Sequence, residues 1–285
     1  MLKQRIMTAL ILIPAVVGLI YLLPTFIVAL VFAAIVLLGG REWSKMVPCT
    51  TAKSQKLFLL AISVLLLVGY FISFSSTLVL IICMFAVAWW SFVLLWLWQV
   101  RTSGHEAAQS VGRVTGLAQC LVGSPRNKAV IGLATLLPCF IAITYLHTSA
   151  EYGAHYVFYC MSLMWAADSG AYFAGKKWGN RKLAPGVSPG KTIEGVTGGC
   201  VAAAIWTILW MFFAGLGESS PLLFFVIAMI TTLYSVGGDL FESLFKRIAQ
   251  IKDSGQLLPG HGGVLDRIDS LTAGAPVFVL GLMLL

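Results

Sequence analysis

The stretch IMTALILIPAVVGLIYLLPTFIVALVFAAIVLLGG at residues 6–40 is strongly apolar and contains no charged side chain. A helix needs about 20 apolar residues to cross the hydrocarbon core of a bilayer. The stretch is too long for one such helix and suits two, separated near Pro24, because proline breaks a helix. Lys3 and Arg5 precede it as in a signal peptide, but no A-x-A cleavage site follows. We therefore expect an uncleaved first membrane span.

The composition of the whole chain agrees with a membrane protein. Of the 285 residues, 59% are hydrophobic and 11% are charged, and the mean hydropathy is +0.92. A soluble domain carries roughly 25% charged residues. These values exclude a water-soluble globule, a disordered chain and a small disulfide-bonded scaffold. The six cysteines lie far apart and form no C-x-x-C pair, so we predict structural thiols.

Further apolar stretches complete the expected set of spans, at residues 57–100, 129–146, 156–174, 195–214, 221–238 and 271–285. The first of these is long enough for two helices, which we expect to separate at the polar run 73–77. The predicted fold class is therefore an all-α integral membrane protein with about nine transmembrane helices. Eight spans are the alternative, because the second span, which follows Pro24, and the last span, at residues 271–285, are short.

The basic residues test this arrangement, because Lys and Arg collect in loops that face the cytosol. With nine spans, all 19 Lys and Arg fall at the N-terminus and in the loops on one side of the membrane. The opposite loops carry only Glu151 and Glu218. We therefore expect the N-terminus and the basic loops in the cytosol. This topology also accounts for the net charge of +8, so nucleic-acid binding is not required.

Two carboxylates interrupt the apolar spans at similar depth. Asp168 precedes Lys176 by eight residues, and Asp239 precedes Lys246 by seven. At 1.5 Å per helical residue, each carboxylate lies about 12 Å from the basic end of its span. A charge inside the bilayer costs about 2.5 to 3.5 kcal/mol and usually faces a polar interior. We predict one polar cavity open to the cytosol, with a polar contact between two packed helices as the alternative.

The span that contains Asp239 continues with polar residues at helical spacing. If it stays helical, four side chains share one face directed into the cavity: Asp239, Glu242, Ser243 and Lys246. An amphipathic helix end with a salt bridge at i, i+4 is the alternative. A glycine-rich loop then leads to Asp266 and Asp269. With Asp239, these carboxylates could hold Mg²⁺, which prefers oxygen ligands. An N-cap is the alternative role for Asp266.

The loop GVSPGKT at residues 186–192 is a candidate anion site. It is one residue short of a P-loop, because Pro185 stands where the first glycine is needed, and it follows a membrane helix instead of a strand. We therefore reject a P-loop fold. Ser188, Lys191 and Thr192 nevertheless precede a predicted helix, and a helix N-terminus with a nearby lysine attracts phosphate. Membrane topology alone is the alternative explanation for the lysines.

The segment SLFKRIAQIKDSGQLLPGHGGVLDRID at residues 243–269 resembles the signature of the phosphatidate cytidylyltransferases (CDP-diacylglycerol synthases) throughout its length. DSGAYFAGKKWG at 168–179 and SPGKTIEG at 188–195 are similar to motifs of bacterial members. The resemblance implies about nine transmembrane helices around a polar cavity that faces the cytosol. It also implies an enzyme that makes CDP-diacylglycerol and pyrophosphate from CTP and phosphatidate with Mg²⁺.

The matching positions imply roles for individual residues. Three acidic residues are implied both as metal ligands and as catalytic residues: Asp239, Asp266 and Asp269. A second cation beside Mg²⁺ is left open. The other implied catalytic residues surround the phosphates of the substrates: Lys246, Arg247, Lys252, His261 and Arg267. Implied substrate-binding positions are Asp168, Ser188, Lys191, Thr192, Glu194, Ser243, Gly262 and Gly263.

The same reasoning gives a location and partners. We expect a multi-pass protein of the bacterial inner membrane with one domain, in which residues 1–128 serve packing, oligomer or lipid contact and residues 129–285 carry the active site. CTP, phosphatidate and membrane lipids are the expected partners, and a homodimer is left open. A transporter of a small anion or lipid is the main alternative, because intramembrane carboxylates also mark ion paths. A noncatalytic membrane scaffold is a third interpretation.

Overall fold

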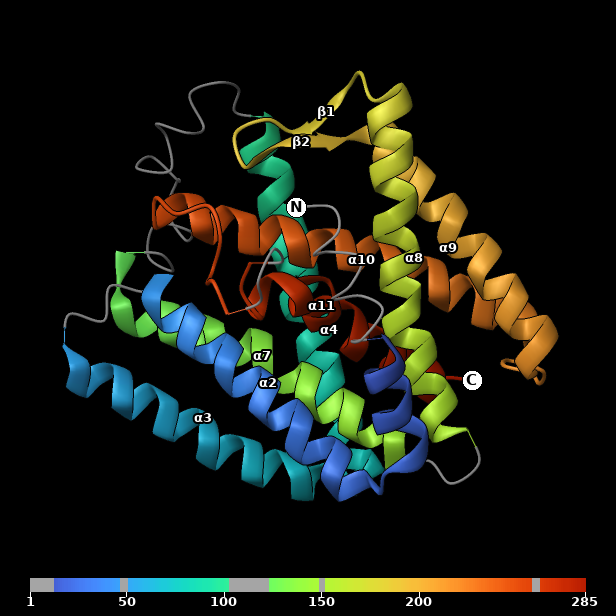
Figure 1. The fold of residues 1–285 in the computed structure, drawn as a ribbon, viewed down its shortest axis with the longest axis horizontal. Coiled ribbons are helices and arrows are strands. Elements are labelled where there is room, and N and C mark those ends of the chain that lie inside the picture. The colour runs from blue at the N-terminus through green and yellow to red at the C-terminus, as the bar shows by residue number, and fades with distance from the viewer. Residues whose placement is uncertain (1–12, 47–50, 103–122, 149–151, 258–261) are drawn as a thin grey trace.

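The protein is seen here as a computed structural model that describes residues 13–46, 51–102, 123–148, 152–257 and 262–285. A short helix, Ile13–Leu22, comes first. The longer helices are α2 (Thr25–Met46), α3 (Ala52–Ile72), α4 (Ser76–Thr102), α7 (Pro125–Thr148), α8 (Gly153–Trp178), α9 (Ile193–Ala214), α10 (Pro221–Ile248) and α11 (Leu265–Met283). Two strands, β1 (Lys182–Ala184) and β2 (Ser188–Thr192), form an antiparallel hairpin between α8 and α9 (Figure 1).

The helices break where the sequence predicts. The first apolar stretch divides at Pro24, between the helix Ile13–Leu22 and α2. Proline has no N–H to donate, but its carbonyl accepts the N–H of Ile27, 2.9 Å away, and so starts α2. The second long stretch divides after α3, where the Ser73 hydroxyl donates to the Tyr70 carbonyl at 2.6 Å. Both predicted divisions are confirmed.

Six helices are long and apolar enough to cross a membrane, judged by length and composition: α2, α3, α4, α7, α9 and α10. An integral membrane protein built from helices agrees with this finding. The expected nine spans are not reached among the described residues, because Ile13–Leu22 is short and α8 and α11 are not in this set. Both of these helices carry acidic residues, Asp168 in α8 and Asp266 and Asp269 in α11.

The helix ends fall into two groups (Figure 1). The last residues of α2, α4, α8 and α10 and the first residues of α3, α7, α9 and α11 lie toward the upper and left side of the view. The opposite ends lie toward the lower and right side. Lys45, Lys176 and Lys246 belong to the first group of ends, whereas Glu218 belongs to the second. This arrangement agrees with the predicted alternation of basic and non-basic loops.

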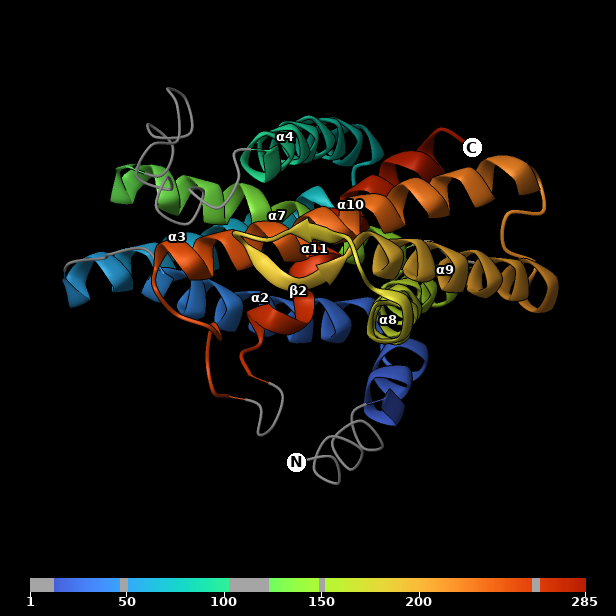
Figure 2. The same cartoon turned by 90° about the horizontal axis from the view of Figure 1, so that it is seen from above.

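Helix α11 forms the centre of the molecule. Every residue from 270 to 279 is buried, and α11 packs against α2, α4, α7, α8 and α10. Figure 2 shows α4 on one side of the layer that contains α7 and α10, with the N-terminal helix on the opposite side. A helix that is apolar all round is a buried helix, so α11 contacts protein on every side along this stretch. Its first turn carries Asp266, and Asp269 follows one turn later.

Small residues bring α8 and α9 into close contact. A Cβ added at Gly170 would lie 2.7 Å from the Gly198 carbonyl oxygen, and one added at Gly199 would lie 2.8 Å from the Ala167 oxygen. Such small residues let helix backbones approach inside a membrane. The close contact places Gly195, at the start of α9, beside Ala171 and Gly175 of α8, in the turns that follow Asp168.

The described cysteines agree with the prediction of structural thiols. Cys83, Cys139 and Cys160 are free and buried, and Cys200 is free and partly buried. Cys49 and Cys120 lie outside the described residues.

Candidate functional site

The β-hairpin leads directly into α9. Thr192 is the N-cap of α9, and its hydroxyl oxygen accepts the Gly195 N–H at 3.1 Å. The carboxylate of Glu194 accepts the N–H groups of Asn180 and Arg181, both at 3.1 Å, and pairs with Arg181 Nε at 2.8 Å. Glu194 therefore holds the start of the hairpin against α9.

The hairpin corrects one part of the sequence argument. Residues 188–192 form a strand, and β1 precedes them, so the expectation of a loop without any strand was wrong here. The glycine-lysine-threonine run lies in β2 itself, and no glycine-rich loop separates β2 from α9. A P-loop remains excluded, because that fold needs a free loop whose N–H groups surround the phosphates.

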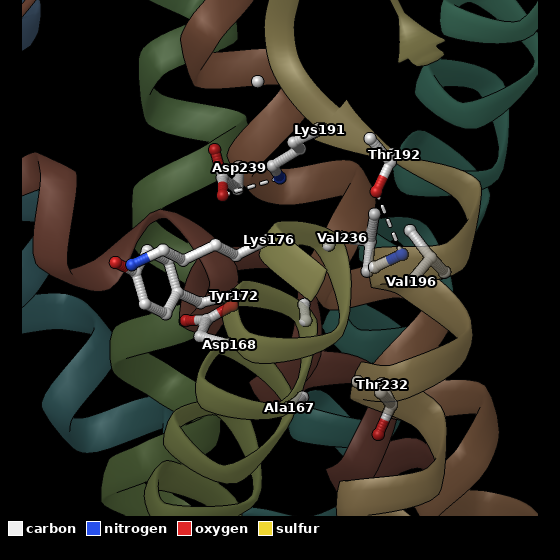
Figure 3. A pocket seen from close by; sticks show the side chains of 15 residues that line it. Ala167, Asp168, Tyr172, Lys176, Lys191, Thr192, Val196, Thr232, Val236 and Asp239 are labelled. Atoms are coloured by element: carbon white, nitrogen blue, oxygen red, sulfur yellow. Dashed lines mark hydrogen bonds and ion pairs between the residues drawn. The ribbon is translucent and has the colours of Figure 1, made fainter. Parts of the chain in front are cut away.

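A cavity of about 390 Å³ opens between α8, α10, the hairpin and the start of α9 (Figure 3). Four of the predicted site residues line it: Asp168, Lys191, Thr192 and Asp239. Lys176 and Tyr172 of α8 also line it, and Lys176 Nζ lies 5.9 Å from the centre of the Tyr172 ring. The cavity thus contains both basic and acidic side chains, all contributed by residues after 166.

Lys191 and Asp239 form an ion pair across the cavity. Lys191 Nζ lies 2.6 Å from Asp239 Oδ2, and both side chains are about three-quarters buried, with exposures of 25% and 28%. The Ser243 hydroxyl approaches Asp239 Oδ1 at 3.4 Å. Asp168 is close enough to interact electrostatically with Asp239, Lys191 and Arg267. These contacts bring Asp168 and Asp239, the two carboxylates that the sequence predicts within membrane spans, together at one cavity.

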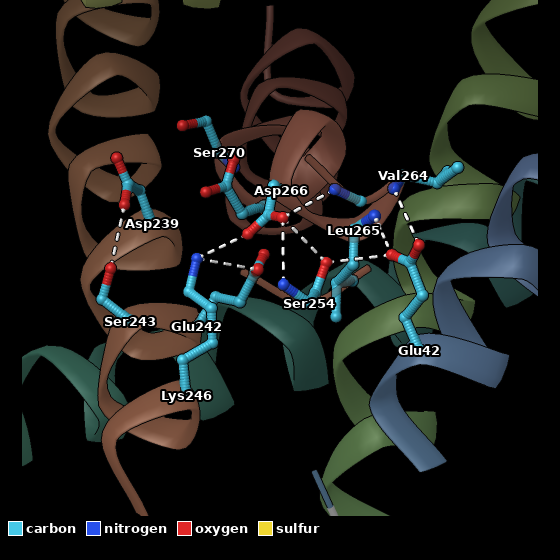
Figure 4. A network of polar contacts seen from close by, with 12 residues as sticks. Glu42, Asp239, Glu242, Ser243, Lys246, Ser254, Val264, Leu265, Asp266 and Ser270 are labelled. Atoms are coloured by element: carbon cyan, nitrogen blue, oxygen red, sulfur yellow. Dashed lines mark hydrogen bonds and ion pairs between the residues drawn. The ribbon is translucent and has the colours of Figure 1, made fainter. Parts of the chain in front are cut away.

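A second polar cluster lies beside the cavity, between the end of α10 and the start of α11 (Figure 4). Lys246 Nζ lies 3.1 Å from Glu242 Oε1 and 2.6 Å from Asp266 Oδ1. The salt bridge at i, i+4 that the sequence left as an alternative therefore exists. Glu242 and Lys246 face Asp266, whereas Asp239 on the same helix faces the cavity.

Asp266 uses both carboxylate oxygens in this cluster. Oδ1 accepts from Lys246, and Oδ2 accepts the N–H groups of Gly263 at 2.8 Å and Ser254 at 3.1 Å. Burial raises the pKa of Asp266, but the hydrogen bonds from Lys246 and from the Gly263 N–H outweigh it and lower the pKa to about 2. Val264 is the N-cap of α11, so Asp266 lies in the first turn and is not the N-cap.

Asp269 connects the two groups of charges. It interacts electrostatically with Asp239, Asp168 and Lys191 at the cavity and with Glu242 in the second cluster. Its Oδ1 accepts the N–H of Ser270 at 2.7 Å. A Cβ at Gly238 would collide with the Asp269 carbonyl oxygen. The absence of a side chain at Gly238 therefore lets α10 and α11 approach at the level of Asp239 and Asp269.

No three His, Cys, Asp or Glu side chains are arranged to share one metal ion in the part of the chain that the structure describes. Two carboxylates can suffice, because Mg²⁺ usually takes one or two from the protein and completes its shell with phosphate oxygens and water. Asp239 and Asp269 fit this requirement better than Asp266. Both Asp266 oxygens are held by protein donors, whereas Asp239 pairs with Lys191, which phosphate could replace, and Asp269 accepts the Ser270 N–H.

The remaining predicted residues lie around these two groups. Arg247 Nε donates to the Val187 carbonyl at 3.2 Å and so connects α10 to the hairpin. Ser188 pairs with Ala184 across the hairpin. Lys252 is exposed in the segment after α10.

The glycine-rich end of the signature is described only from residue 262 onward. Gly262 has a φ of +81°, which favours glycine, and a Cβ there would lie 2.9 Å from Asp266 Oδ2. Gly263 is buried and donates to Asp266. His261 lies outside the described residues.

Sequence reasoning missed three residues at the site. Lys176 and Tyr172 line the cavity, although the sequence explained Lys176 by topology alone. Glu42 is 1% exposed and contacts the start of α11. A single carboxylate between Arg41 and Lys45 forms no motif, so only the tertiary structure reveals it.

Comparison with known proteins adds a family to this geometry. The sequence model described as "Cytidylyltransferase family" matches residues 3–285. A protein of Haemophilus influenzae named phosphatidate cytidylyltransferase is 36% identical over 98% of this chain and 97% of its own length. A protein of the same name from Pseudomonas aeruginosa is 38% identical over 98% of this chain and 96% of its own length. One from Bacillus subtilis is 42% identical over 49% of this chain and 54% of its own length. None of these names supports the transporter alternative.

Proposed function

This chain belongs to the cytidylyltransferase family, and we propose that it transfers a cytidylyl group from CTP to phosphatidate, which gives CDP-diacylglycerol and pyrophosphate. The observation that carries the proposal is the cavity in which Lys191, Asp168 and Asp239 meet. Asp168 and Lys191 come from segments that resemble the family, and Asp239 lies four residues before the third such segment. The relatives align over nearly the whole chain.

The proposed location is a bacterial cell membrane with the cavity open to the cytosol. The cavity lies at the hairpin, among the basic helix ends, and positive loops face the cytosol. CTP would then enter from water, and the headgroup of phosphatidate would enter from the inner leaflet. Residues 129–285 would carry the reaction, because every side chain that lines the cavity lies there. Nine spans and a homodimer remain predictions.

The main physical obstacle to the reaction is repulsion between two polyanions. Lys191 and Lys176 line the cavity, and Arg267 is close enough to interact with Asp168. Cationic side chains around transferring phosphates stabilise charge and hold the reacting groups in line. We assign Lys191 to the phosphates of CTP, because it lies two residues before the start of α9, where the helix dipole also favours an anion.

Asp239 and Asp269 would hold Mg²⁺, with Asp168 close by. Their carboxylates come from α10 and α11, which approach closely at Gly238. When bound, the ion would neutralise and orient phosphate oxygens, which is its usual contribution to phosphoryl transfer. Asp266 could act as the third predicted ligand only if one of its hydrogen-bond donors moved away. In the structure, Asp266 pairs with Lys246 and orients it.

The reaction needs positioning more than proton transfer. An oxygen of the phosphatidate phosphate forms a bond to the α-phosphorus of CTP, and the bond to the departing pyrophosphate breaks. A phosphate monoester has a second pKa near 6, so the attacking oxygen is largely ionised at neutral pH. No protein base is therefore required. Lys191 and Lys176 hold the two substrates in line, and Thr192 and the neighbouring glycines shape the wall on the side of α9.

The deciding experiment uses the purified full chain in vesicles that contain phosphatidate, with labelled CTP and Mg²⁺ outside. We expect labelled CDP-diacylglycerol and pyrophosphate in equal amounts, and loss of both on chelation of the metal. Labelled ATP, GTP and UTP serve as matched controls. Movement of intact CTP into the vesicles without product would indicate a transporter, and neither product nor movement would indicate a scaffold; either result overturns the proposal.

A further inference from the structure

A carboxylate from the N-terminal part of the chain lies at the start of α11. Glu42, near the end of α2, is 1% exposed, and its Oε1 accepts the Val264 N–H at 3.1 Å. Its Oε2 accepts the Leu265 N–H at 2.8 Å and the Ser254 hydroxyl at 2.9 Å (Figure 4). Glu42 thus contacts residues that lie more than 200 positions further along the chain.

These bonds replace a missing helix cap. The first N–H groups of any helix have no partner within the helix and need an acceptor from elsewhere. Val264 is the N-cap of α11, and its apolar side chain cannot accept a hydrogen bond. Glu42 supplies the acceptor from another helix, and its negative charge also suits the positive end of the α11 dipole.

Two glycines make room for the Glu42 carboxylate. A Cβ at Gly255 would collide with Glu42 Oε1, and a Cβ at Gly263 would lie 2.5 Å from Oε2. Both glycines belong to the segment that resembles the family signature. Their lack of a side chain lets the loop close around the carboxylate.

Glu42 is also connected to the charged cluster through one hydroxyl. Ser254 Oγ lies 2.9 Å from Glu42 Oε2 and 3.0 Å from Asp266 Oδ2, and Asp266 binds Lys246 at 2.6 Å. A hydroxyl has a single hydrogen, so Ser254 donates to one carboxylate at a time. The chain of contacts joins α2, the loop after α10, the first turn of α11 and the end of α10.

We propose that Glu42 is a positioning residue for cytidylyl transfer. By holding the first turn of α11, it sets where Asp269 stands relative to Asp239, one turn further along the helix. Glu42 lines no part of the cavity and touches no reacting atom. The inference rests on the proposed function, and it assigns part of the site geometry to α2, which the sequence places among spans used for packing.

The test compares Glu42→Gln with Glu218→Gln, which removes an exposed carboxylate at the opposite end of the molecule. Glutamine keeps the size but turns an NH₂ group toward one of the backbone donors. We expect Glu42→Gln to raise the Mg²⁺ concentration for half-maximal activity by about tenfold, a typical loss for a residue behind a metal ligand, and to lower kcat. A purely structural role would reduce the amount of active protein and leave the Mg²⁺ dependence unchanged, which would overturn the proposal.

A second measurement needs neither substrate nor metal. Hydrogen–deuterium exchange of the protein in vesicles should show the amides of Val264 and Leu265 exchanging about tenfold faster in Glu42→Gln than in the parent chain, with α9 unchanged. Equal exchange in both proteins would contradict the cap. Should the parent chain make no CDP-diacylglycerol, the proposed function fails, while this measurement still decides whether Glu42 holds α11.

Ser254→Ala is the second variant, and it serves where Glu42→Gln fails to insert into the membrane. It removes the hydroxyl bridge but keeps both bonds from Glu42 to the backbone of α11. We expect the Mg²⁺ requirement to rise in the same direction by roughly threefold, below the usual range for such residues. A Mg²⁺ dependence identical to that of the parent chain would overturn the role of the Glu42–Ser254–Asp266 connection.

Discussion

At the scale of single residues, the Lys191–Asp239 pair is the contact most directly affected by substrate. Both side chains are about three-quarters buried, so their attraction exceeds that of an exposed pair. A bound nucleotide would offer Lys191 phosphate oxygens in place of the carboxylate. Asp239 would then be released to a cation that arrives with the nucleotide. The pair therefore keeps each charge satisfied before the substrates bind.

Asp269→Asn should abolish CTP-dependent turnover while membrane insertion stays intact. Asparagine keeps the shape of the side chain, but it removes the negative charge that would attract the metal. Loss of one such electrostatic contact typically costs about 10²- to 10³-fold in kcat. Asp239→Asn should behave alike, and Glu218→Gln should retain full activity. Full activity in the Asp269→Asn protein would remove Asp269 from the proposed metal site.

Lys191→Met should lower kcat/KM for CTP by about 100-fold, equal to ~2.7 kcal/mol. The change keeps the length of the side chain and removes the charge that we assign to the phosphates. Lys177→Met is the matched control, because Lys177 is exposed, stacks over Trp178 at 4.8 Å and does not line the cavity. Steady-state kinetics with varied CTP measures both. Equal losses in the two variants would point to a general effect of surface charge.

At the scale of elements, the site depends on how closely pairs of helices approach. α8 and α9 meet at glycines, which places Thr192 beside Gly175 and lets Thr192 and Asp168 line one cavity, and α10 meets α11 at Gly238. The hairpin then closes the cavity, fastened by Arg247 to α10 and by Glu194 to α9. The carboxylates and lysines of the cavity thus come from three elements, α8, β2 and α10, and backbone contacts set the positions of these elements.

Gly238→Ala should lower both thermal stability and activity. The added Cβ would collide with the Asp269 carbonyl oxygen, so α10 and α11 must separate. Overpacking of this kind typically costs about 1 to 3 kcal/mol. Gly123→Ala is the control, because a Cβ there meets nothing within 4 Å. Unfolding temperature and turnover are measured in the same detergent; a Gly238→Ala protein that matches Gly123→Ala in both would refute the close approach.

At the scale of the whole molecule, helix ends alternate between two sides, and the cavity lies on the side where basic ends collect. The central position of α11 explains how its Asp269 comes near Asp168 of α8 and Asp239 of α10. Helices α2, α4, α7, α8 and α10 surround α11 and bury its residues 270–279, whereas Arg267 in its first turn is exposed. The exposed apolar residues of the outer helices, such as Phe212 and Leu222, suit contact with lipid.

The orientation is tested by labelling introduced cysteines with a membrane-impermeant maleimide. Lys252→Cys should react in inside-out vesicles and stay unlabelled in right-side-out vesicles, because basic loops face the cytosol. Ser219→Cys should show the reverse pattern. The parent chain gives the background, and its described cysteines are buried or partly buried. Labelling of both variants from the same side would contradict the alternation of the loops.

Hydropathy and charge alone were enough to predict helices in a membrane, their breaks at Pro24 and near Ser73, and the cavity shared by Asp168 and Asp239. The family was predicted from the resemblance of the segments 168–179, 188–195 and 243–269 to its motifs. These features are local or follow from the bilayer, which forces apolar runs into helices and leaves charges few places to go. The sequence could not indicate that Asp266 forms an ion pair with Lys246, that residues 188–192 form a strand, or that Glu42 caps α11. Those features depend on contacts between residues distant along the chain, and such contacts arise only when the helices pack.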